Sequence, residues 1–344
     1  MELQQWRDFL SGRGATWDRD QAHFADTGGE LQLIDLSPMG AVSVTGADSQ
    51  KFLQGQFTCD LVNLPDHHTT LGAHCNPKGR VISAFFALKV ARDDFVLCMP
   101  RDLAAVATAA LARYSVFFKA DLCDISADHQ WLGLQGAEAV RHAAELLGLE
   151  GLDSGTVVPF EIDSSRALAF AVSPQQVAIL VPRAQAEELW QRLESHAQAA
   201  SYGNWLGQQI AAGIPQLHTD TSEAFIPQML NLHVLDGVSF KKGCYTGQEV
   251  VARLQYRGAT KRRMFRARCE PGPLPTPGTD IRIGEHRPAG EVLTAAPVAG
   301  GIELLAVLNN ALVAVEDPLC LDDGRALKLL DLPYDADADP LAEP

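Results

Sequence analysis

The segment from Lys241 to Glu249 constrains the fold most sharply, because it combines a helix start with a thiol and two ammonium groups. It reads Lys-Lys-Gly-Cys-Tyr-Thr-Gly-Gln-Glu. Thr246 and Glu249 have the Thr-x-x-Glu spacing of a capping box and precede two valines, so a helix is predicted to begin with Thr246 as its N-cap. Cys244 would then lie just outside the positive end of that helix.

Cys244 is the candidate reactive group. Nearby cations and a helix N-terminus favour the thiolate, which is the form that acts as a nucleophile or a metal ligand. The alternative is a small buried cysteine on an ordinary helix-entry turn. We expect the thiol to be functional and to be supported by the other residues of the segment: Lys241, Lys242, Gly243, Tyr245, Thr246, Gly247, Gln248 and Glu249.

The run from Lys242 to Glu249 resembles the signature Lys-Gly-Cys-Tyr-x-Gly-Gln-Glu of the YgfZ family, folate-binding proteins linked to iron–sulfur enzyme maintenance and tRNA modification. The resemblance spans residues 31–335, nearly the whole chain. Its other matching segments are Val44–Asp48 with Gln54–Gln56, Ala73–Cys75 with Lys78-Gly79, and Phe225–Gln228 with Asn231-Leu232.

The resemblance implies an α+β fold like that of the glycine cleavage aminomethyltransferase, with a folate-binding body of ferredoxin-like layers and a C-terminal antiparallel β-barrel. Hydrophobic patterns predict the strand Leu31–Asp35, the helix Asp102–Tyr114 and, beyond Lys261, the short alternating strands of a barrel, Asp280–Ile283 among them. The expected domains are an N-terminal segment (1–30), the body (31–258, with an internal boundary near 125), the barrel (259–335) and a flexible acidic tail (336–344).

A site for tetrahydrofolate or a derivative is also implied by the resemblance. Trp205 offers a flat apolar face for a pterin ring, and Met39 is assigned to the same site. Gln228 and Asn231 are neutral polar groups that can recognise the edge of a heterocycle. The alternatives are a core tryptophan and ordinary loop residues.

Two departures from related folate enzymes affect the predicted chemistry. Where the aminomethyltransferase has a Gly-Gly-x-Ile-Asp-Asp segment, this chain runs Gly79-Arg80-Val81-Ile82-Ser83-Ala84 and lacks both acids. Without a carboxylate, aminomethyl transfer has no evident acid–base group, and we disfavour it. Ala211 stands where many relatives have an acid that bonds the pterin, so folate would be held by other groups such as Gln228.

Basic residues cluster beside the Cys244 segment although the chain carries a net charge of −15. Nine Lys or Arg and one acid lie between Lys241 and Arg268, against 19 basic and 42 acidic residues elsewhere. Such a belt suits RNA phosphates or the glutamate tail of folate, and the alternative is a solvated face. The candidate anion-binding residues are Arg253, Arg257, Lys261, Arg262 and Arg263.

The seven cysteines are scattered, odd in number and never spaced as Cys-x-x-Cys. This pattern argues against a disulfide framework, a zinc ribbon, a metal site of the protein's own or a permanently bound iron–sulfur cluster. No apolar run approaches the ~20 residues that span a bilayer, and the N-terminus lacks the order of a signal peptide. We therefore expect a cytoplasmic protein with no membrane partner. A monomer is expected as well, although no pattern in the sequence specifies the oligomeric state.

Three hypotheses follow for function. The first is a folate-binding factor of the YgfZ type that acts through Cys244 in iron–sulfur cluster assembly or repair, and so in tRNA thio-modification. Its partners would be folate, iron–sulfur enzymes such as tRNA-thiolating proteins, and tRNA itself by direct contact. The alternatives are a folate-dependent one-carbon transferase or demethylase, and an RNA-binding module that uses the basic belt 253–268.

Overall fold

The computed structural model describes residues 3–25, 28–257, 260–284, 287–315, 317–338 and 341. By backbone contact the chain divides into two compact units, and each is assembled from segments that are far apart in sequence. Unit 1 consists of Met1–Gln50, Val62–Thr70 and Phe86–Trp205. Unit 2 consists of Lys51–Leu61, Leu71–Phe85 and Leu206–Pro344.

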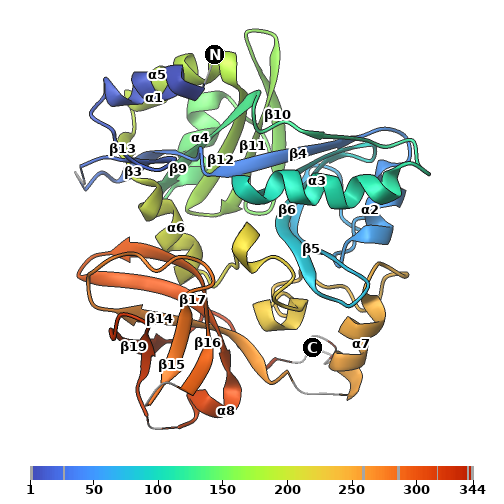
Figure 1. The fold of residues 1–344 in the computed structure, drawn as a ribbon. Coiled ribbons are helices and arrows are strands. Elements are labelled where there is room, and N and C mark those ends of the chain that lie inside the picture. Colours follow the sequence, from blue (N-terminus) through green and yellow to red (C-terminus); the bar gives the residue numbers. More distant parts are fainter. Residues whose placement is uncertain are drawn as a thin grey trace. The chain divides into compact units, whose positions relative to one another are not determined.

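A six-stranded sheet forms the centre of unit 1 (Figure 1). β13 runs parallel to β3, and every other neighbouring pair is antiparallel. The strand order is β10 (Val157–Ile162), β11 (Ser165–Ser173), β12 (Gln176–Pro182), β9 (His129–Gly136), β3 (Leu31–Asp35) and β13 (Gln198–Ala200).

Three amphipathic helices of unit 1 share one core cluster with strands of this sheet: α1 (Leu3–Ser11), α4 (Ala139–Leu147) and α5 (Ala186–Glu194). Their buried residues recur at helical spacing, as in Ala139, Ala143 and Leu147 of α4, so each helix presents one apolar face to the core. Each buried leucine or tryptophan stabilises the fold by roughly 2 kcal/mol relative to exposure. This packing attaches α1 firmly to unit 1.

Trp6 of α1 also makes a polar contact in this core, because its Nε1 donates to Oδ1 of Asp35 at 3.0 Å. The same Oδ1 accepts bonds from Ser37 and from Gln130 Nε2 at 2.9 Å. Oδ2 of Asp35 is buried and has no hydrogen-bond partner within the described ranges. Burial raises the pKa of Asp35 to about 6, although the bonds from Ser37 and Trp6 oppose the shift.

A second sheet has five strands. Their order is β5 (His68–Cys75), β6 (Val81–Ala91), β7 (Asp94–Pro100), β4 (Met39–Thr45) and β8 (Asp121–Asp124). α3 (Arg101–Ser115) packs on β4, β7 and β8 and buries Leu103, Ala107 and Leu111. The remaining elements of the first 221 residues are β1 (Thr16–Asp18), β2 (Gln21–His23), α2 (Ser49–Gln56), η1 (Arg183–Gln185), α6 (Tyr202–Ala211) and η2 (Thr219–Thr221).

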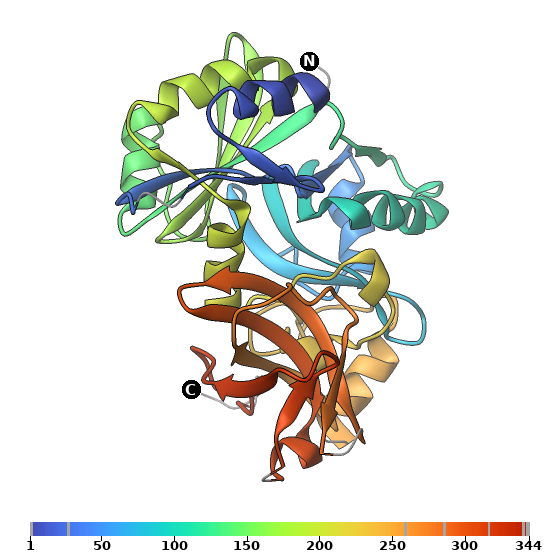
Figure 2. The same cartoon turned by 60° about the vertical axis from the view of Figure 1, so that its left-hand side comes forward.

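The C-terminal part of unit 2 is a closed antiparallel barrel, as predicted (Figure 2). Alternate residues of its strands point into the core, such as Leu304, Ala306 and Leu308 of β17. The strand order is β14 (Arg262–Cys269), β17 (Gly301–Asn309), β16 (Arg287–Val298), β15 (Asp280–Ile283), β18 (Leu319–Leu321) and β19 (Ala326–Leu330), and α8 (Asn310–Val313) follows β17.

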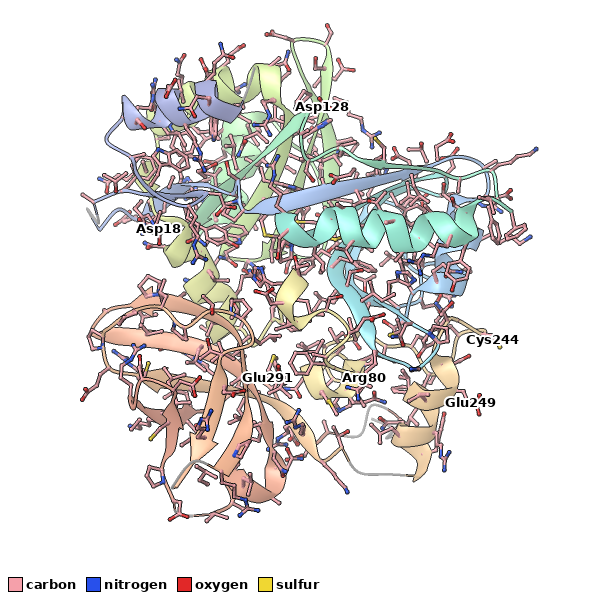
Figure 3. All side chains as sticks on the ribbon, in the orientation of Figure 1. Asp18, Arg80, Asp128, Cys244, Glu249 and Glu291 are labelled. Atoms are coloured by element: carbon pink, nitrogen blue, oxygen red, sulfur yellow. The ribbon has the colours of Figure 1, made fainter. Side chains whose placement is uncertain are left out.

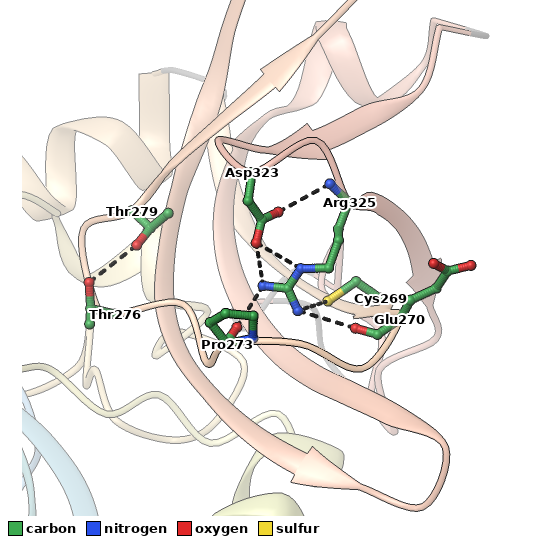
Figure 4. Close-up of polar contacts among 7 residues, drawn as sticks. All are labelled: Cys269, Glu270, Pro273, Thr276, Thr279, Asp323 and Arg325. Atoms are coloured by element: carbon green, nitrogen blue, oxygen red, sulfur yellow. Dashed lines mark hydrogen bonds and ion pairs between the residues drawn. The ribbon is translucent and has the colours of Figure 1, made fainter.

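Arg325, in the loop between β18 and β19, fastens the segment that leaves β14 (Figure 4). Its guanidinium donates to the backbone oxygens of Glu270 at 3.2 Å and Pro273 at 2.6 Å. Nε donates to Asp323 at 2.8 Å, and Nη1 lies 3.8 Å from the buried thiol of Cys269. Arg325 therefore provides donors for two backbone carbonyls of the loop that follows β14.

The predicted α+β class and C-terminal barrel are thus confirmed. Among the helices that the structure describes, none combines the length and apolarity needed to cross a bilayer.

Candidate functional site

Cys244 lies in an exposed turn that leads into α7 (Gln248–Arg257), and its side chain points away from the ribbon (Figure 3). The predicted N-cap at Thr246 implies a first helical residue at position 247, and the helix begins one residue later, at Gln248. The reason is Gly247, whose φ of +84° places it in the left-handed region, outside helical geometry. The hydroxyl of Thr246 donates to Oε1 of Gln56 at 3.3 Å, so the capping-box prediction is corrected.

Lys242 anchors the turn from inside unit 2. Its ammonium has three N–H donors, and each one reaches a backbone oxygen at or just after the end of α2: Gln54 at 2.8 Å, Phe57 at 2.7 Å and Cys59 at 2.7 Å. Carbonyls at the C-terminal end of a helix lack partners within the helix and attract a cation. Lys242 thus ties the Cys244 turn to the end of α2.

This bonding revises the part that was predicted for the two lysines beside Cys244. Burial lowers the pKa of Lys242 to about 8, with the neighbouring Cys59 and Asp60 opposing the shift. Its three donors serve backbone carbonyls, and its charge lies 5.2 Å from the ring centroid of the buried Tyr245. Lys241, by contrast, is exposed and is the lysine of the pair that faces solvent.

Gly247 also packs tightly against the turn between β5 and β6. A Cβ at this position would lie 2.6 Å from the backbone oxygen of Asn76 and 3.1 Å from Cα of Gly79. In return, a Cβ on Gly79 would lie 2.9 Å from Cβ of Val250 in α7. Only glycine fits at these contacts, and we call this mutual packing of Gly79 and Gly247 the glycine interlock. Gly243, next to the thiol, has open space around it.

Two more thiols lie close to the motif and were not predicted to be part of the site. Cβ of Cys75 is 3.1 Å from the Cβ position of Gly247, and Cys59 accepts the bond from Lys242 through its backbone oxygen. Burial raises the pKa of both thiols to about 12, so they are protonated at neutral pH. Cys244 is the exposed thiol of this group. Sequence spacing gave no signal for this proximity.

Gln228 in η3 (Pro227–Leu230) and the adjacent Asn231 are buried in unit 2. Gln228 Nε2 donates to the backbone oxygen of Val251 at 2.7 Å, and Asn231 Nδ2 donates to that of Met264 at 3.0 Å. Their side-chain oxygens are buried and have no hydrogen-bond partner in the part of the chain that the structure describes. Both can accept a bond from an N–H donor of a ligand.

The other two predicted folate residues belong to unit 1. Trp205 is 3% exposed, and its indole occupies the space beside Gly133, where a Cβ would lie 2.9 Å from Cε3. Met39 is buried, and its sulfur accepts a bond from the hydroxyl of Tyr202 at 3.7 Å. This is the arrangement expected of core residues, and pterin contact by either one stays a prediction.

The basic belt carries less free charge than its sequence indicates. The structure gives three of its arginines a carboxylate partner: Arg262 with Glu291 at 3.6 Å, Arg266 with Glu303 at 2.6 Å, and Arg263 with Asp337. Arg253 and Lys261 are exposed, whereas the side chain of Arg257 lies outside the described residues. The paired arginines all lie on β14, and anion binding by the belt stays a prediction.

Comparisons with known proteins identify the family and the fold of the chain. The family model of the GCVT N-terminal domain matches residues 7–241. The tRNA-modifying protein YgfZ of Yersinia enterocolitica is 36% identical over 310 residues, which cover 88% of this chain and 92% of that protein. The chain belongs to the YgfZ family. The YgfZ of Edwardsiella ictaluri is likewise 36% identical, over 315 residues that cover 89% of this chain and 93% of that one.

The fold of this YgfZ-family chain is that of the aminomethyltransferases. Its structure matches the glycine cleavage system aminomethyltransferase T of Bartonella henselae with a TM-score of 0.69 at 17% identity. The match covers 89% of this chain and 86% of that one. The fold and family implied by the Lys242–Glu249 signature are thereby confirmed.

Proposed function

We propose that this YgfZ-family chain supports the assembly or repair of iron–sulfur clusters, and thereby the thio-modification of tRNA, through Cys244. The observation that carries the proposal is the contrast among three neighbouring thiols: Cys59 and Cys75 are buried with raised pKa values, and Cys244 is exposed. The name of the relatives, tRNA-modifying protein, supports the tRNA side of the proposal.

The turn suits a thiol that must meet a large partner. Lys242 fixes the backbone from one side through three carbonyls, and the glycine interlock fixes it from the other. Because Cys244 is exposed, a cluster or an electrophile on another protein can reach the sulfur. Cys244 would release its proton to solvent and offer a sulfur lone pair as a transient ligand or nucleophile.

Tetrahydrofolate is the proposed small-molecule ligand, and the residues of unit 2 fit it. When bound, it would supply a reduced pterin that carries one-carbon units. The buried oxygens of Gln228 and Asn231, which have no hydrogen-bond partner among the described residues, are suited to accept hydrogen bonds from the N–H groups of the pterin edge. β6 brings no carboxylate from the segment 79–84, and nothing on this strand favours aminomethyl transfer.

The proposal is tested in cells that lack the native protein. Wild type and Cys244→Ser are compared for the level of thiolated tRNA, with the folded abundance of each variant measured in parallel. Cys123→Ser is the matched control, because Cys123 is also an exposed free thiol. We expect Cys244→Ser to lose complementation and Cys123→Ser to retain it. Full complementation by Cys244→Ser would contradict the proposal.

A further inference from the structure

α7 exposes two large apolar side chains beside the Cys244 turn. Val250 is 40% exposed and Tyr256 is 62% exposed, and the exposed Arg253 stands between them in sequence. Side chains three residues apart are neighbours on a helix surface, so the three form a continuous ridge. We call this ridge of Val250, Arg253 and Tyr256 the α7 face. An exposed tyrosine beside an exposed arginine is a composition that recurs at the centres of protein–protein interfaces.

Both ends of the α7 face are attached to the structure that carries Cys244. Val250 contacts the backbone at Gly79, within the glycine interlock. The ring of Tyr256 meets that of Phe240 edge-on, with centroids 6.5 Å apart and an interplanar angle of 76°. Phe240 directly precedes the two lysines of the motif. Side chains that are held in place before binding lose less conformational entropy when a partner docks.

From these observations we propose that the α7 face is the docking surface for the protein whose iron–sulfur site Cys244 serves, which we call the client. This inference rests on the proposed function and adds the partner and its binding surface. Tyrosine and arginine are enriched among the residues that contribute most to protein–protein affinity, and here they stand together. From Val250 to Tyr256 the helix rises by about 9 Å, a length that fits within one standard interface.

The charge of the α7 face specifies the chemistry of the client. Arg253 is the exposed cation of the face itself, the exposed Lys241 and Lys261 lie before and after α7 in the sequence, and Glu249 is the exposed acid of its first turn. A matching surface presents an apolar pocket for Tyr256 with carboxylates at its border. RNA is the weaker candidate, because affinity for phosphates grows with the number of free cations, and three arginines of the belt are paired with carboxylates.

The test measures binding of the full-length protein to one purified probe, the iron–sulfur tRNA-thiolating enzyme of the same cell with its clusters intact. The variants are Arg253→Glu and Tyr256→Ala. Matched controls change residues of the same type on α3 of unit 1, Arg113→Glu and Tyr114→Ala, where Tyr114 is 36% exposed. The alkylation rate of Cys244 with iodoacetamide, measured in a Cys123→Ser background, shows whether each variant keeps the turn intact.

We expect each α7 variant to weaken the affinity by roughly tenfold or more, with unchanged alkylation and with both controls within about twofold of wild type. Wild-type affinity in both α7 variants overturns the docking surface. The docking surface is also overturned if the wild-type protein does not bind the enzyme at about 100 μM. It is overturned as well if the α7 variants bind the enzyme normally and lose affinity only for unmodified tRNA, titrated in parallel. Because binding is measured without activity, failure here is distinct from complementation by Cys244→Ser, which would overturn the proposed function instead.

Discussion

Lys242 Nζ donates a hydrogen bond to the backbone oxygen of Cys59 over 2.7 Å, between residues 183 positions apart in the chain. Lys242 lies only two residues before Cys244, the thiol that it was predicted to activate. Its ammonium is nevertheless bonded to a different segment of unit 2. Its effect on Cys244 is positional: it fixes the backbone from which the thiol projects. This relationship sets the first prediction.

Lys242→Met is expected to lower the free energy of unfolding by about 3 kcal/mol, because it leaves three backbone oxygens without their charged donor. Urea denaturation followed by circular dichroism measures the change. Lys241→Met is the matched control; its side chain is exposed, and we expect a change below about 0.5 kcal/mol. Equal effects of the two substitutions would show that Lys242 does not anchor the turn.

Gly247→Ala is expected to destabilise unit 2 by about 3 kcal/mol, from its left-handed φ together with the contact at the backbone oxygen of Asn76. Gly243→Ala serves as its control, since no described atom lies within 4 Å of the Cβ position of Gly243. The stability of the two variants is compared by thermal unfolding. A tolerated alanine at position 247 would contradict the glycine interlock.

Asp35 predicts a pH dependence of stability in unit 1. Its pKa is raised from 3.8 to about 6, so the folded state favours the neutral acid, with Oδ2 as the site for the proton. The stability that protonation contributes is complete below pH 3.8 and is lost as the pH rises through 6. The difference in unfolding free energy between wild type and Asp35→Asn should fall by about 3 kcal/mol across this interval. If this difference in unfolding free energy did not change with pH, the raised pKa of Asp35 would be contradicted.

Arg325→Met should loosen the segment that follows β14 by removing its bonds to Glu270 and Pro273 (Figure 4). We expect a loss of about 2 kcal/mol in stability and faster labelling of the buried Cys269 by a thiol reagent. Arg282→Met is the matched control, because Arg282 also has carboxylate partners on the barrel but lies in exposed ion pairs. Labelling of Cys269 at the wild-type rate in Arg325→Met would show that Arg325 does not hold this segment in place.

Hydrophobic patterns predicted helices and strands well where the apolar residues recur with one clear period. The predicted strands Leu31–Asp35 and Asp280–Ile283 coincide with β3 and β15, and the predicted helix Asp102–Tyr114 lies within α3. β13 and β18 were missed, since each has only three residues and is defined by its pairing rather than by a hydrophobic period. β13 joins β3 in parallel, and no local signal reports such a pairing.

The sequence indicated which residues belong to the candidate site better than it indicated which contacts they make. The sequence indicated Cys244 and its motif, but the start of α7 depended on the backbone angle of Gly247, which residue type alone leaves open. The belt arginines looked free because Glu291 and Glu303, their partners, reach them only through the pairing of β14, β16 and β17. Charge counts along a chain cannot detect partners that the sheet supplies.

The glycine interlock has a consequence for how the site opens. The turn at Asn76 and the turn at Gly247 pack directly against each other, so outward movement of either one breaks the contact that supports the other. Amide hydrogens of the two turns, such as those of Gly79 and Val251, should therefore exchange with solvent deuterium at one common rate, as a single cooperative unit. The local opening free energy at Cys244 is then set in part by a hairpin in another part of the sequence.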